Sequence, residues 1–284
     1  MANISLIKKR IQTAQNVSKT TKAMQMIAAS KLKKAQEAAL MARPYVEKLT
    51  SVSQNLTSKI EKDNLHPYMI ENTSTKKLTL VISPDKGLAG SLVTNIAKEV
   101  INTEGKNNQY IVLGKKMELI LRKLGGEILA SFPFGTTLPS FDTVYPILQI
   151  IDDNFLNKKV LEVSIIYTKF ESVFTQKASI ANLLPIKLEK NEQKQSETMI
   201  FEPSIDYLLP SILRHFLEMT VYQNILESYA SEQAARMIAM KNATDNANEI
   251  VEELKLEYNK GRQEKITNEI LDIGGATFAL NYEQ

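Results

Sequence analysis

Cysteine is absent from this chain of 284 residues, and histidine occurs only at His66 and His215. Without thiols the chain can form no disulfide, no thiolate metal site and no cysteine nucleophile. Neither histidine has a second ligand at a spacing typical of metal sites, so we expect both to be structural. We therefore predict no metal site, no catalytic residue and no cofactor.

Long apolar runs are also missing. No segment approaches the length of about 20 apolar residues that crosses a bilayer. The first ten residues lack the uninterrupted apolar core of a signal peptide. We expect a soluble protein of bacterial type, rather than an organellar precursor, that stays in the compartment where it is made.

Residues that break helices are rare at both ends of the chain. Residues 1–43 contain neither glycine nor proline, and residues 211–284 contain no proline and only Gly261, Gly274 and Gly275. Each stretch therefore predicts a long helix. At about 1.5 Å per residue, the C-terminal helix would be roughly 110 Å long, more than its own globular part can cover.

Three short motifs refine these two helices. Ser204 can cap the C-terminal helix, and Asp206 can complement its dipole. In the N-terminal helix, Arg43-Pro44-Tyr45 predicts an interruption or a kink, because proline removes a backbone donor.

Both predicted helices carry a seam of apolar, small and polar residues at alternating steps of three and four. Such a heptad seam needs a facing helix. The N-terminal seam is Ile4, Ile7, Ile11, Ala14, Ser18, Thr21, Gln25, Ala28, Leu32, Ala35, Ala39 and Ala42. The C-terminal seam is Ile212, Phe216, Met219, Gln223, Leu226, Ala230, Gln233, Met237, Met240, Thr244, Ala247, Val251, Leu254 and Tyr258. We predict that the two helices pair as an antiparallel coiled coil.

Basic charge is concentrated in the N-terminal helix. Residues 1–62 contain twelve Lys and Arg residues against Glu37, Glu47 and Glu61. This pattern allows a solvated basic face, an acidic protein partner or a nucleic-acid partner. The first 44 residues contain no aromatic side chain that could stack on a base, which disfavours nucleic acid.

Residues 76–190 alternate between short apolar runs and amphipathic stretches, which predicts a small α/β domain with a mainly parallel sheet. The predicted strands are 78–83, 110–114, 127–132, 162–168 and, at a sheet edge, 178–186. The predicted helices are 88–104, 116–124 and 141–152.

Nucleotide-binding motifs are incomplete in this domain. Gly87 and Gly90 are similar to half of a dinucleotide fingerprint, but the sequence has neither G-x-G-x-x-G nor G-x-x-x-x-G-K-[ST]. We interpret the two glycines as parts of a tight turn beside a closely packed helix. A nucleotide-dependent enzyme remains an alternative.

Several separated motifs resemble those of one family. Residues 19–31 read Lys-Thr-Thr-Lys-Ala-Met-Gln-Met-Ile-Ala-Ala-Ser-Lys, residues 230–237 read Ala-Ser-Glu-Gln-Ala-Ala-Arg-Met, and residues 239–247 read Ala-Met-Lys-Asn-Ala-Thr-Asp-Asn-Ala. Residues 258–263 read Tyr-Asn-Lys-Gly-Arg-Gln, and residues 266–270 read Ile-Thr-Asn-Glu-Ile. In this order they resemble the gamma subunit of the F-type ATP synthase, the central rotor shaft, and the resemblance extends over the full length.

The resemblance implies a fold of class α plus α/β, in which an antiparallel coiled coil of long N- and C-terminal helices carries an inserted small Rossmann-like α/β domain. The domains would be an N-terminal shaft helix (1–62), a foot (76–190) and a C-terminal shaft helix (204–284). The shaft would turn inside a ring of alternating alpha and beta subunits, and the foot would meet the epsilon subunit and the membrane ring of c subunits.

The resemblance also implies a non-catalytic rotor subunit, since catalysis belongs to the beta subunits of the family. It would couple proton or sodium flow to ATP synthesis or hydrolysis, peripherally at the cytoplasmic face of the inner (plasma) membrane. We expect no nucleic acid and no small-molecule ligand. Ala89 stands where many relatives have cysteine, and no cysteine-bearing insertion precedes the terminal helix, so redox control is not expected.

Two sets of contact residues follow from matching the family motifs. Those expected to face the ring of alpha and beta subunits are Lys22, Met24, Arg236, Arg262, Gln263 and Thr267. Those expected in the foot, toward the epsilon subunit or the c ring, are Arg43, Pro44, Tyr45 and Glu202.

Overall fold

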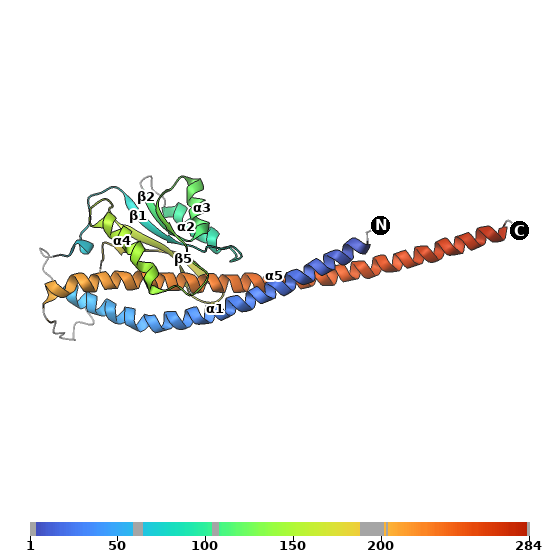
Figure 1. Ribbon diagram of the computed structural model, residues 1–284, viewed down its shortest axis with the longest axis horizontal. Coiled ribbons are helices and arrows are strands. Elements are labelled where there is room, and N and C mark those ends of the chain that lie inside the picture. The colour runs from blue at the N-terminus through green and yellow to red at the C-terminus, as the bar shows by residue number, and fades with distance from the viewer. Residues whose placement is uncertain (1–3, 59–64, 104–107, 188–201, 203, 283–284) are drawn as a thin grey trace. The chain divides into compact units, whose positions relative to one another are not determined.

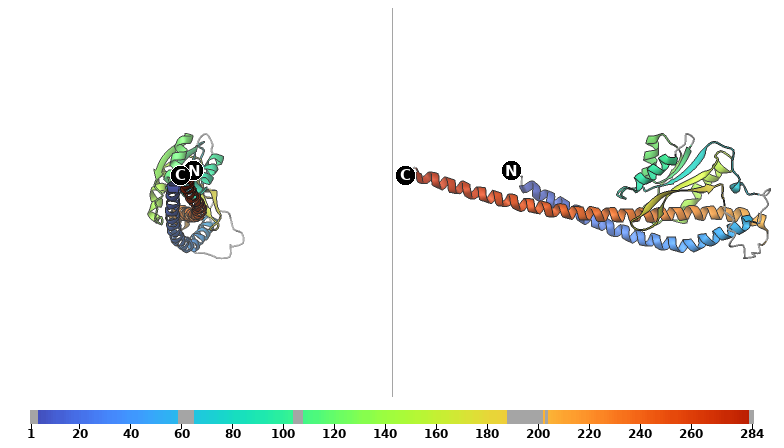
Figure 2. Two further views of the ribbon diagram at one scale, coloured as in Figure 1. Left: turned by 90° about the vertical axis from the view of Figure 1, so that its right-hand side faces the viewer. Right: turned by 180° about the vertical axis from the view of Figure 1, so that it is seen from behind.

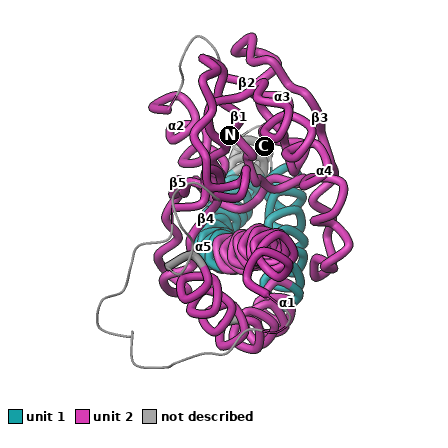
Figure 3. Tube along the Cα trace, turned by 90° about the vertical axis from the view of Figure 1, so that its left-hand side faces the viewer, with its two compact units in different colours: residues 1–27, 237–284 teal, residues 28–236 magenta. Residues whose placement is uncertain are grey.

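The computed structural model describes residues 4–58, 65–103, 108–187, 202 and 204–282. Contacts divide the chain into two compact units, which Figure 3 distinguishes by colour. Unit 1 comprises residues 1–27 and 237–284, and unit 2 comprises residues 28–236. Two long helices, α1 (Ile4–Ser58) and α5 (Ile205–Tyr282), each contribute residues to both units.

In unit 1, α1 and α5 pack against each other as antiparallel helices. Ser18 Oγ donates a hydrogen bond to Asn248 Oδ1 at 2.7 Å, and the hydroxyls of Thr21 and Thr244 are hydrogen-bonded at 2.7 Å. As the residue number rises along α1, the residue number of its partner on α5 falls, so the two helices run in opposite directions. The predicted antiparallel coiled coil is confirmed.

The seam predicted for unit 1 is also confirmed. On α1, every described residue up to position 27 that is not exposed belongs to the predicted seam; these are Ile4, Ile7, Ile11, Ala14, Ser18, Thr21 and Gln25. On α5, the fully buried residues from position 237 onward are Met240, Thr244, Ala247, Val251 and Leu254. The alternating steps of three and four residues place each set on one face of its own helix.

The described residues of unit 2 form one five-stranded sheet in the order β3-β2-β1-β4-β5. Its strands are β1 (Lys77–Ile82), β2 (Asn108–Leu113), β3 (Glu127–Phe132), β4 (Val163–Phe170) and β5 (Gln176–Leu184). The first four are parallel, and β5 pairs with β4 in the antiparallel direction at one edge. The mainly parallel sheet and the final edge strand confirm the prediction.

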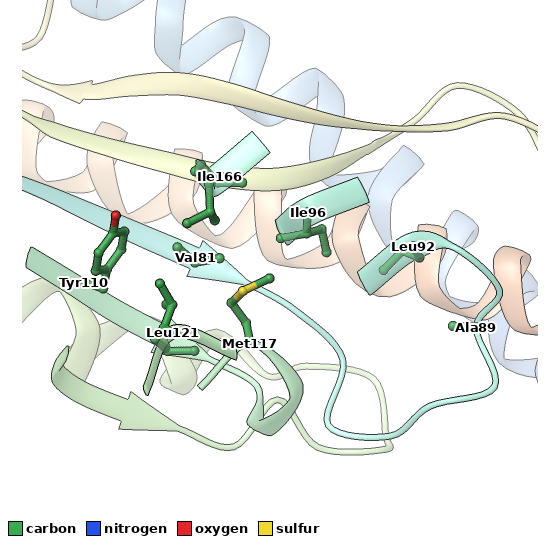
Figure 4. Packing of buried hydrophobic residues seen from close by; sticks show 10 residues of the cluster. Val81, Ala89, Leu92, Ile96, Tyr110, Met117, Leu121 and Ile166 are labelled. Atoms are coloured by element: carbon green, nitrogen blue, oxygen red, sulfur yellow. The ribbon is translucent and has the colours of Figure 1, made fainter. Parts of the chain in front are cut away.

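Helices cover both faces of this sheet. They are α2 (Leu92–Thr103), α3 (Lys115–Leu124) and α4 (Val144–Phe155), with short turns of 3₁₀ helix at Pro67–Met69 and Phe141–Thr143. Figure 4 shows Val81 and Ile166 of the sheet packed with Ile96 of α2 and Met117 of α3. The intervening strand residues are also buried, as expected for a parallel sheet covered on both faces.

In unit 2, α5 lies between the sheet and α1 (Figures 1 and 2). The fully buried aliphatic residues of its first turns are spaced four apart: Leu209, Leu213, Leu217, Val221 and Ile225. The predicted seam residues Ile212, Phe216, Met219 and Gln223 are only partly buried. The predicted seam is therefore wrong in this part of α5, because a helix with two neighbours buries more than one stripe.

Two local predictions need correction. The helix α1 continues through Pro44, so the predicted interruption is absent, and the alternative of a kink there stays a prediction. Pro44 is exposed, and so is Leu40, whose carbonyl loses its backbone donor to the proline. The helix predicted from residue 88 begins at Leu92 instead, because Leu88 and Gly90 have positive φ values of 66° and 58° and form a turn.

Candidate functional site

The C-terminal part of α5 extends beyond the helix that covers it. A Cβ atom added at Gly261 would lie 3.8 Å from Ile4 Cγ1, at the start of α1, and α5 continues from there to Tyr282. Every described side chain between Arg262 and Ile273 is exposed. This stretch includes four large apolar residues that are 44–69% exposed: Ile266, Ile270, Leu271 and Ile273.

Three predicted contact residues lie in this exposed stretch. Thr267 Oγ1 donates to the carbonyl oxygen of Gln263 at 2.9 Å, a bond within the helix. Arg262 makes no ion pair with any other residue that the structure describes. Its guanidinium group, which has five N–H donors, is therefore available to another molecule.

Lys22 and Met24 form a second level of exposed residues in the coiled coil. They lie beside the seam residues Thr21 and Gln25 on α1. Because Thr21 faces Thr244, this level is roughly 27 Å from Arg262 along the helix axis, at about 1.5 Å per residue. The predicted ring-facing residues of unit 1 thus occupy two levels and do not form a single cluster.

Arg236 differs from the other predicted ring-facing residues because its side chain is only 17% exposed. Its Nη2 atom lies 2.6 Å from Glu232 Oε1 and donates to the carbonyl oxygen of Gly87 at 3.4 Å. Burial raises the pKa of Glu232, and the charge of Arg236 opposes that shift only in part. Arg236 therefore supports a buried carboxylate and the loop after β1.

The predicted foot residues lie in unit 2. Pro44, Tyr45 and Glu202 are exposed, and the side chain of Arg43 lies outside what the structure describes. The hydroxyl of Tyr45 shares a 2.6 Å hydrogen bond with Nε2 of His215, and the two rings meet edge to face. Tyr45 thus ties α1 to α5 while half of its surface stays accessible.

The edge of the sheet at which α/β folds bind nucleotides is covered by α5. The strand order reverses direction at β1, and ligands of open α/β sheets bind beyond the carboxyl ends of strands at such a switch point. Here Ser231 Oγ donates to the carbonyl of Thr168 at the end of β4, at 3.1 Å, and Arg236 contacts Gly87 after β1. This arrangement disfavours the alternative of a nucleotide-dependent enzyme.

The described part of the chain offers neither a metal site nor a membrane-spanning helix. No group of three or more His, Cys, Asp and Glu side chains there is arranged to hold a metal ion. No described helix is both long and apolar enough to span a bilayer.

Sequence reasoning missed the residues that fasten the loops of unit 2. The carboxylate of Asp85 accepts hydrogen bonds from the backbone amides of Lys115, at 2.9 Å, and Gly135, at 2.8 Å. The side chains of Lys31 and Tyr229 both donate to the carbonyl oxygen of Thr136. An aspartate in a turn after a strand suggests a cap, but a partner 50 positions away leaves no periodic signal.

Comparisons with known proteins agree with this architecture. A family model described as ATP synthase matches residues 3–280. The ATP synthase gamma chain of Dehalococcoides mccartyi is 42% identical over 99% of this chain and 100% of its own length.

Two solved structures share the fold. The rotor of the Euglena gracilis mitochondrial ATP synthase in rotational state 1 has a TM-score of 0.67 at 19% identity, covering 93% of this chain and 98% of the other. A chain from the OSCP/F1/c-ring structure of the same enzyme, in rotational state 3, has a TM-score of 0.68 at 19% identity, covering 98% and 94%. Identity over nearly the whole length, together with the paired terminal helices and the inserted sheet, shows that the chain belongs to the ATP synthase gamma chain family.

Proposed function

We propose that the chain is the central rotating shaft of an F-type ATP synthase and that it couples ion flow through a membrane ring to ATP synthesis or hydrolysis. One observation carries this proposal: α5 continues past the start of α1 with every described side chain from Arg262 to Ile273 exposed. A helix with exposed isoleucines and leucine needs cover from other chains. A surrounding ring of alpha and beta subunits would supply that cover.

The coiled coil of unit 1 suits a shaft because its two helices hold each other along one seam. Outside the seam the described residues are mostly polar and exposed, which favours contacts that form and break as the shaft turns. The two helices differ in sequence, so each beta subunit would meet a different face. Rotation would then shift the nucleotide affinity of each beta subunit in sequence, through differential contacts.

We assign the ring-facing contacts to Lys22, Met24, Arg262, Gln263 and Thr267, all exposed in unit 1. The cations would pair transiently with carboxylates of the beta subunits. Arg236 would act indirectly, by holding Glu232 and the loop at Gly87.

The foot contacts are assigned to Arg43, Pro44, Tyr45 and Glu202, toward the epsilon subunit or the c ring. The chain itself would be non-catalytic, and the complex would hold it at the cytoplasmic face of the membrane. The division into a shaft helix (1–62), a foot (76–190) and a second shaft helix (204–284) remains part of this proposal.

The ring contacts are tested by a double substitution, Arg262→Ala with Gln263→Ala, in the assembled complex. We expect lower coupled ATP synthesis or fewer assembled complexes, because two polar contacts to the ring are lost. A double substitution of the exposed pair Glu252 and Lys255 to alanine is the matched control on the same helix. Unchanged assembly and unchanged coupling in the first variant would refute the assignment.

The shaft function is tested by purifying the chain from its own cells. We expect one copy to be recovered with a stoichiometric set of nucleotide-binding alpha and beta subunits. Recovery of the chain without them, from membranes that still make ATP, would contradict the proposal.

A further inference from the structure

The loop that follows β3, residues 133–140, is bonded to both long helices within unit 2. Lys31 of α1 donates from Nζ to the carbonyl oxygen of Thr136 at 2.5 Å. Tyr229 of α5 donates from its hydroxyl to the same oxygen at 3.3 Å. Side chains from α1 and α5 therefore meet at one backbone oxygen of the α/β domain.

Two further contacts join this loop to α5. The hydroxyl of Tyr222 donates to the carbonyl oxygen of Pro139 at 3.3 Å. The rings of Phe134 and Tyr229 meet edge to face, with 6.1 Å between their centroids, and both side chains are buried. The loop is thus attached to α5 by a buried ring contact and two tyrosine hydroxyls.

The same loop is fixed to the rest of the α/β domain. The backbone amide of Gly135 donates to the carboxylate of Asp85 at 2.8 Å, and Asp85 also accepts from the amide of Lys115 at the start of α3. Asp85 lies in the loop after β1. A force on the loop after β3 is therefore passed to two other parts of the domain.

A second attachment lies on a different face of α5. Ser228 and Ser231 bond to the backbone amide and carbonyl of Thr168 on β4. At 3.6 residues per turn, these serines lie roughly 140° around the helix axis from Tyr222 and Tyr229. In the sheet, β4 is separated from β3 by β1 and β2.

Attachment on two faces matters for a part that transmits torque. A domain bonded to one face of a helix can swivel about the helix axis, whereas bonds on two faces oppose this rotation. Lys31 adds a bond to the second helix, and its donor is charged, which makes such a bond stronger than one between neutral groups.

We propose that the loop of residues 133–140 is a torque arm, which locks the α/β domain to α1 and α5 against swivelling about α5. Lys31 is the positioning residue that brings α1 into this lock. The inference rests on the proposed rotor function, and it names the contacts through which the foot would drive the shaft.

The lock is tested by hydrogen exchange in the purified chain. Lys31→Met with Tyr229→Phe removes both donors and keeps similar side-chain sizes, so the amide of Gly135 should exchange at least about tenfold faster. Lys33→Met with Tyr207→Phe, at exposed positions on the same two helices, is the matched control and should leave exchange unchanged. Lys31→Met alone, at a partly exposed position, should give a smaller increase and replaces the double variant if that variant does not fold.

The role in torque is tested in the assembled complex, in sealed membrane vesicles, with a potential-sensitive dye. In Lys31→Met we expect a lower maximal ATP-driven membrane potential but an unchanged rate of ATP hydrolysis once an uncoupler removes the load. Lys31→Arg, which keeps a charged donor, should restore the potential.

Unchanged exchange at Gly135 in both the double variant and Lys31→Met would overturn the lock. Faster exchange with an unchanged maximal potential would overturn its role in torque. Failure of the rotor function itself would show instead in the unaltered chain, whose vesicles would then build no ATP-driven potential.

Discussion

The helix α5 is buried differently in the two units, although it is one continuous helix. In unit 1 its fully buried residues form a single seam, from Met240 to Leu254, and its remaining surface is mostly exposed. In unit 2 it buries an aliphatic face that includes Leu213 and Val221, together with polar residues on neighbouring faces. The number of neighbours, and not the sequence period alone, sets how much of a helix is buried.

The polar contacts follow the same division. In unit 2, side chains of α5 hydrogen-bond to the loops and strand ends of the sheet; Ser228, Ser231 and Arg236 each do so. In unit 1, the polar contacts between described side chains of the two helices join α5 to α1, as at Thr244 and Asn248. The part of α5 in unit 2 is therefore fixed to a folded domain, while the part in unit 1 packs against α1 along one seam. This is the arrangement that a driven shaft requires.

The largest expected effect comes from shortening a buried leucine of α5 in unit 2, with an exposed leucine of α5 in unit 1 as the comparison. Leu213→Ala, at a position without solvent exposure, should lower the free energy of unfolding by about 2–5 kcal/mol, through lost burial and a new cavity. Leu256→Ala, at a position that is 72% exposed, should change it by less than about 0.5 kcal/mol. Urea unfolding of the purified chain measures both. Similar losses in the two variants would contradict the contrast between the units.

The sequence predicted the helices, the strands and the seam of unit 1, because each depends on local periodicity. Glu127–Phe132 was predicted with the bounds that β3 has. In unit 2 the predicted seam residues Leu226, Ala230 and Gln233 are buried, but the buried aliphatic face from Leu209 to Ile225 was not predicted. That face depends on parts of the chain that are distant in sequence. The placement of Arg236 escaped prediction for the same reason, since its partner Gly87 lies 149 positions away. Which exposed residues contact the ring stays a prediction.

The buried carboxylate of Glu232 predicts a pH-dependent contribution to the stability of unit 2. Its pKa in the folded chain is raised, so the folded state binds the proton more tightly than the unfolded state does. Its contribution to stability is therefore fully present below the unfolded pKa of about 4.3 and is lost as pH rises through the folded pKa.

This predicts that Glu232→Gln becomes more stable relative to the original chain as the pH rises from about 4 toward neutrality, since the amide cannot ionise. Unfolding free energies measured across this range give the difference. Glu252→Gln, at an exposed carboxylate, is the matched control and should show no such trend. If the difference in unfolding free energy between Glu232→Gln and the original chain stayed constant across this pH range, burial would not raise the pKa of this carboxylate.

A smaller effect is expected where α1 meets α5 in unit 2. Tyr45→Phe removes the hydrogen bond to His215 and should lower the free energy of unfolding by about 0.5–1.5 kcal/mol, because the ring contact remains. Tyr207→Phe, on an exposed tyrosine of α5, is the control and should have no measurable effect. Equal stability of Tyr45→Phe and Tyr207→Phe would mean that the hydrogen bond between Tyr45 and His215 contributes nothing measurable to the free energy of unfolding.

The smallest net effect is expected at the polar seam of unit 1. Thr21→Val and Thr244→Val each remove one of two hydroxyls that bond to each other. The hydroxyl left behind keeps its bonds to carbonyls of the preceding turn, those of Val17 and Ser18 for Thr21 and that of Met240 for Thr244. Each single change should cost about 0.5–1.5 kcal/mol. The double variant should be close to the original chain, because replacing both partners by apolar groups of the same shape leaves no unpaired hydroxyl.

A double-mutant cycle on the unfolding free energy isolates the coupling between the two hydroxyls. Thr13→Val, at an exposed threonine of α1 whose hydroxyl donates to the carbonyl oxygen of Lys9, corrects for the change in helix propensity. Additive costs in the double variant would mean that the two threonines act independently. The seam of unit 1 would then be stabilised by its apolar residues alone. The contrast with unit 2, where hydrogen bonds join α5 to the sheet and its loops, would then be larger.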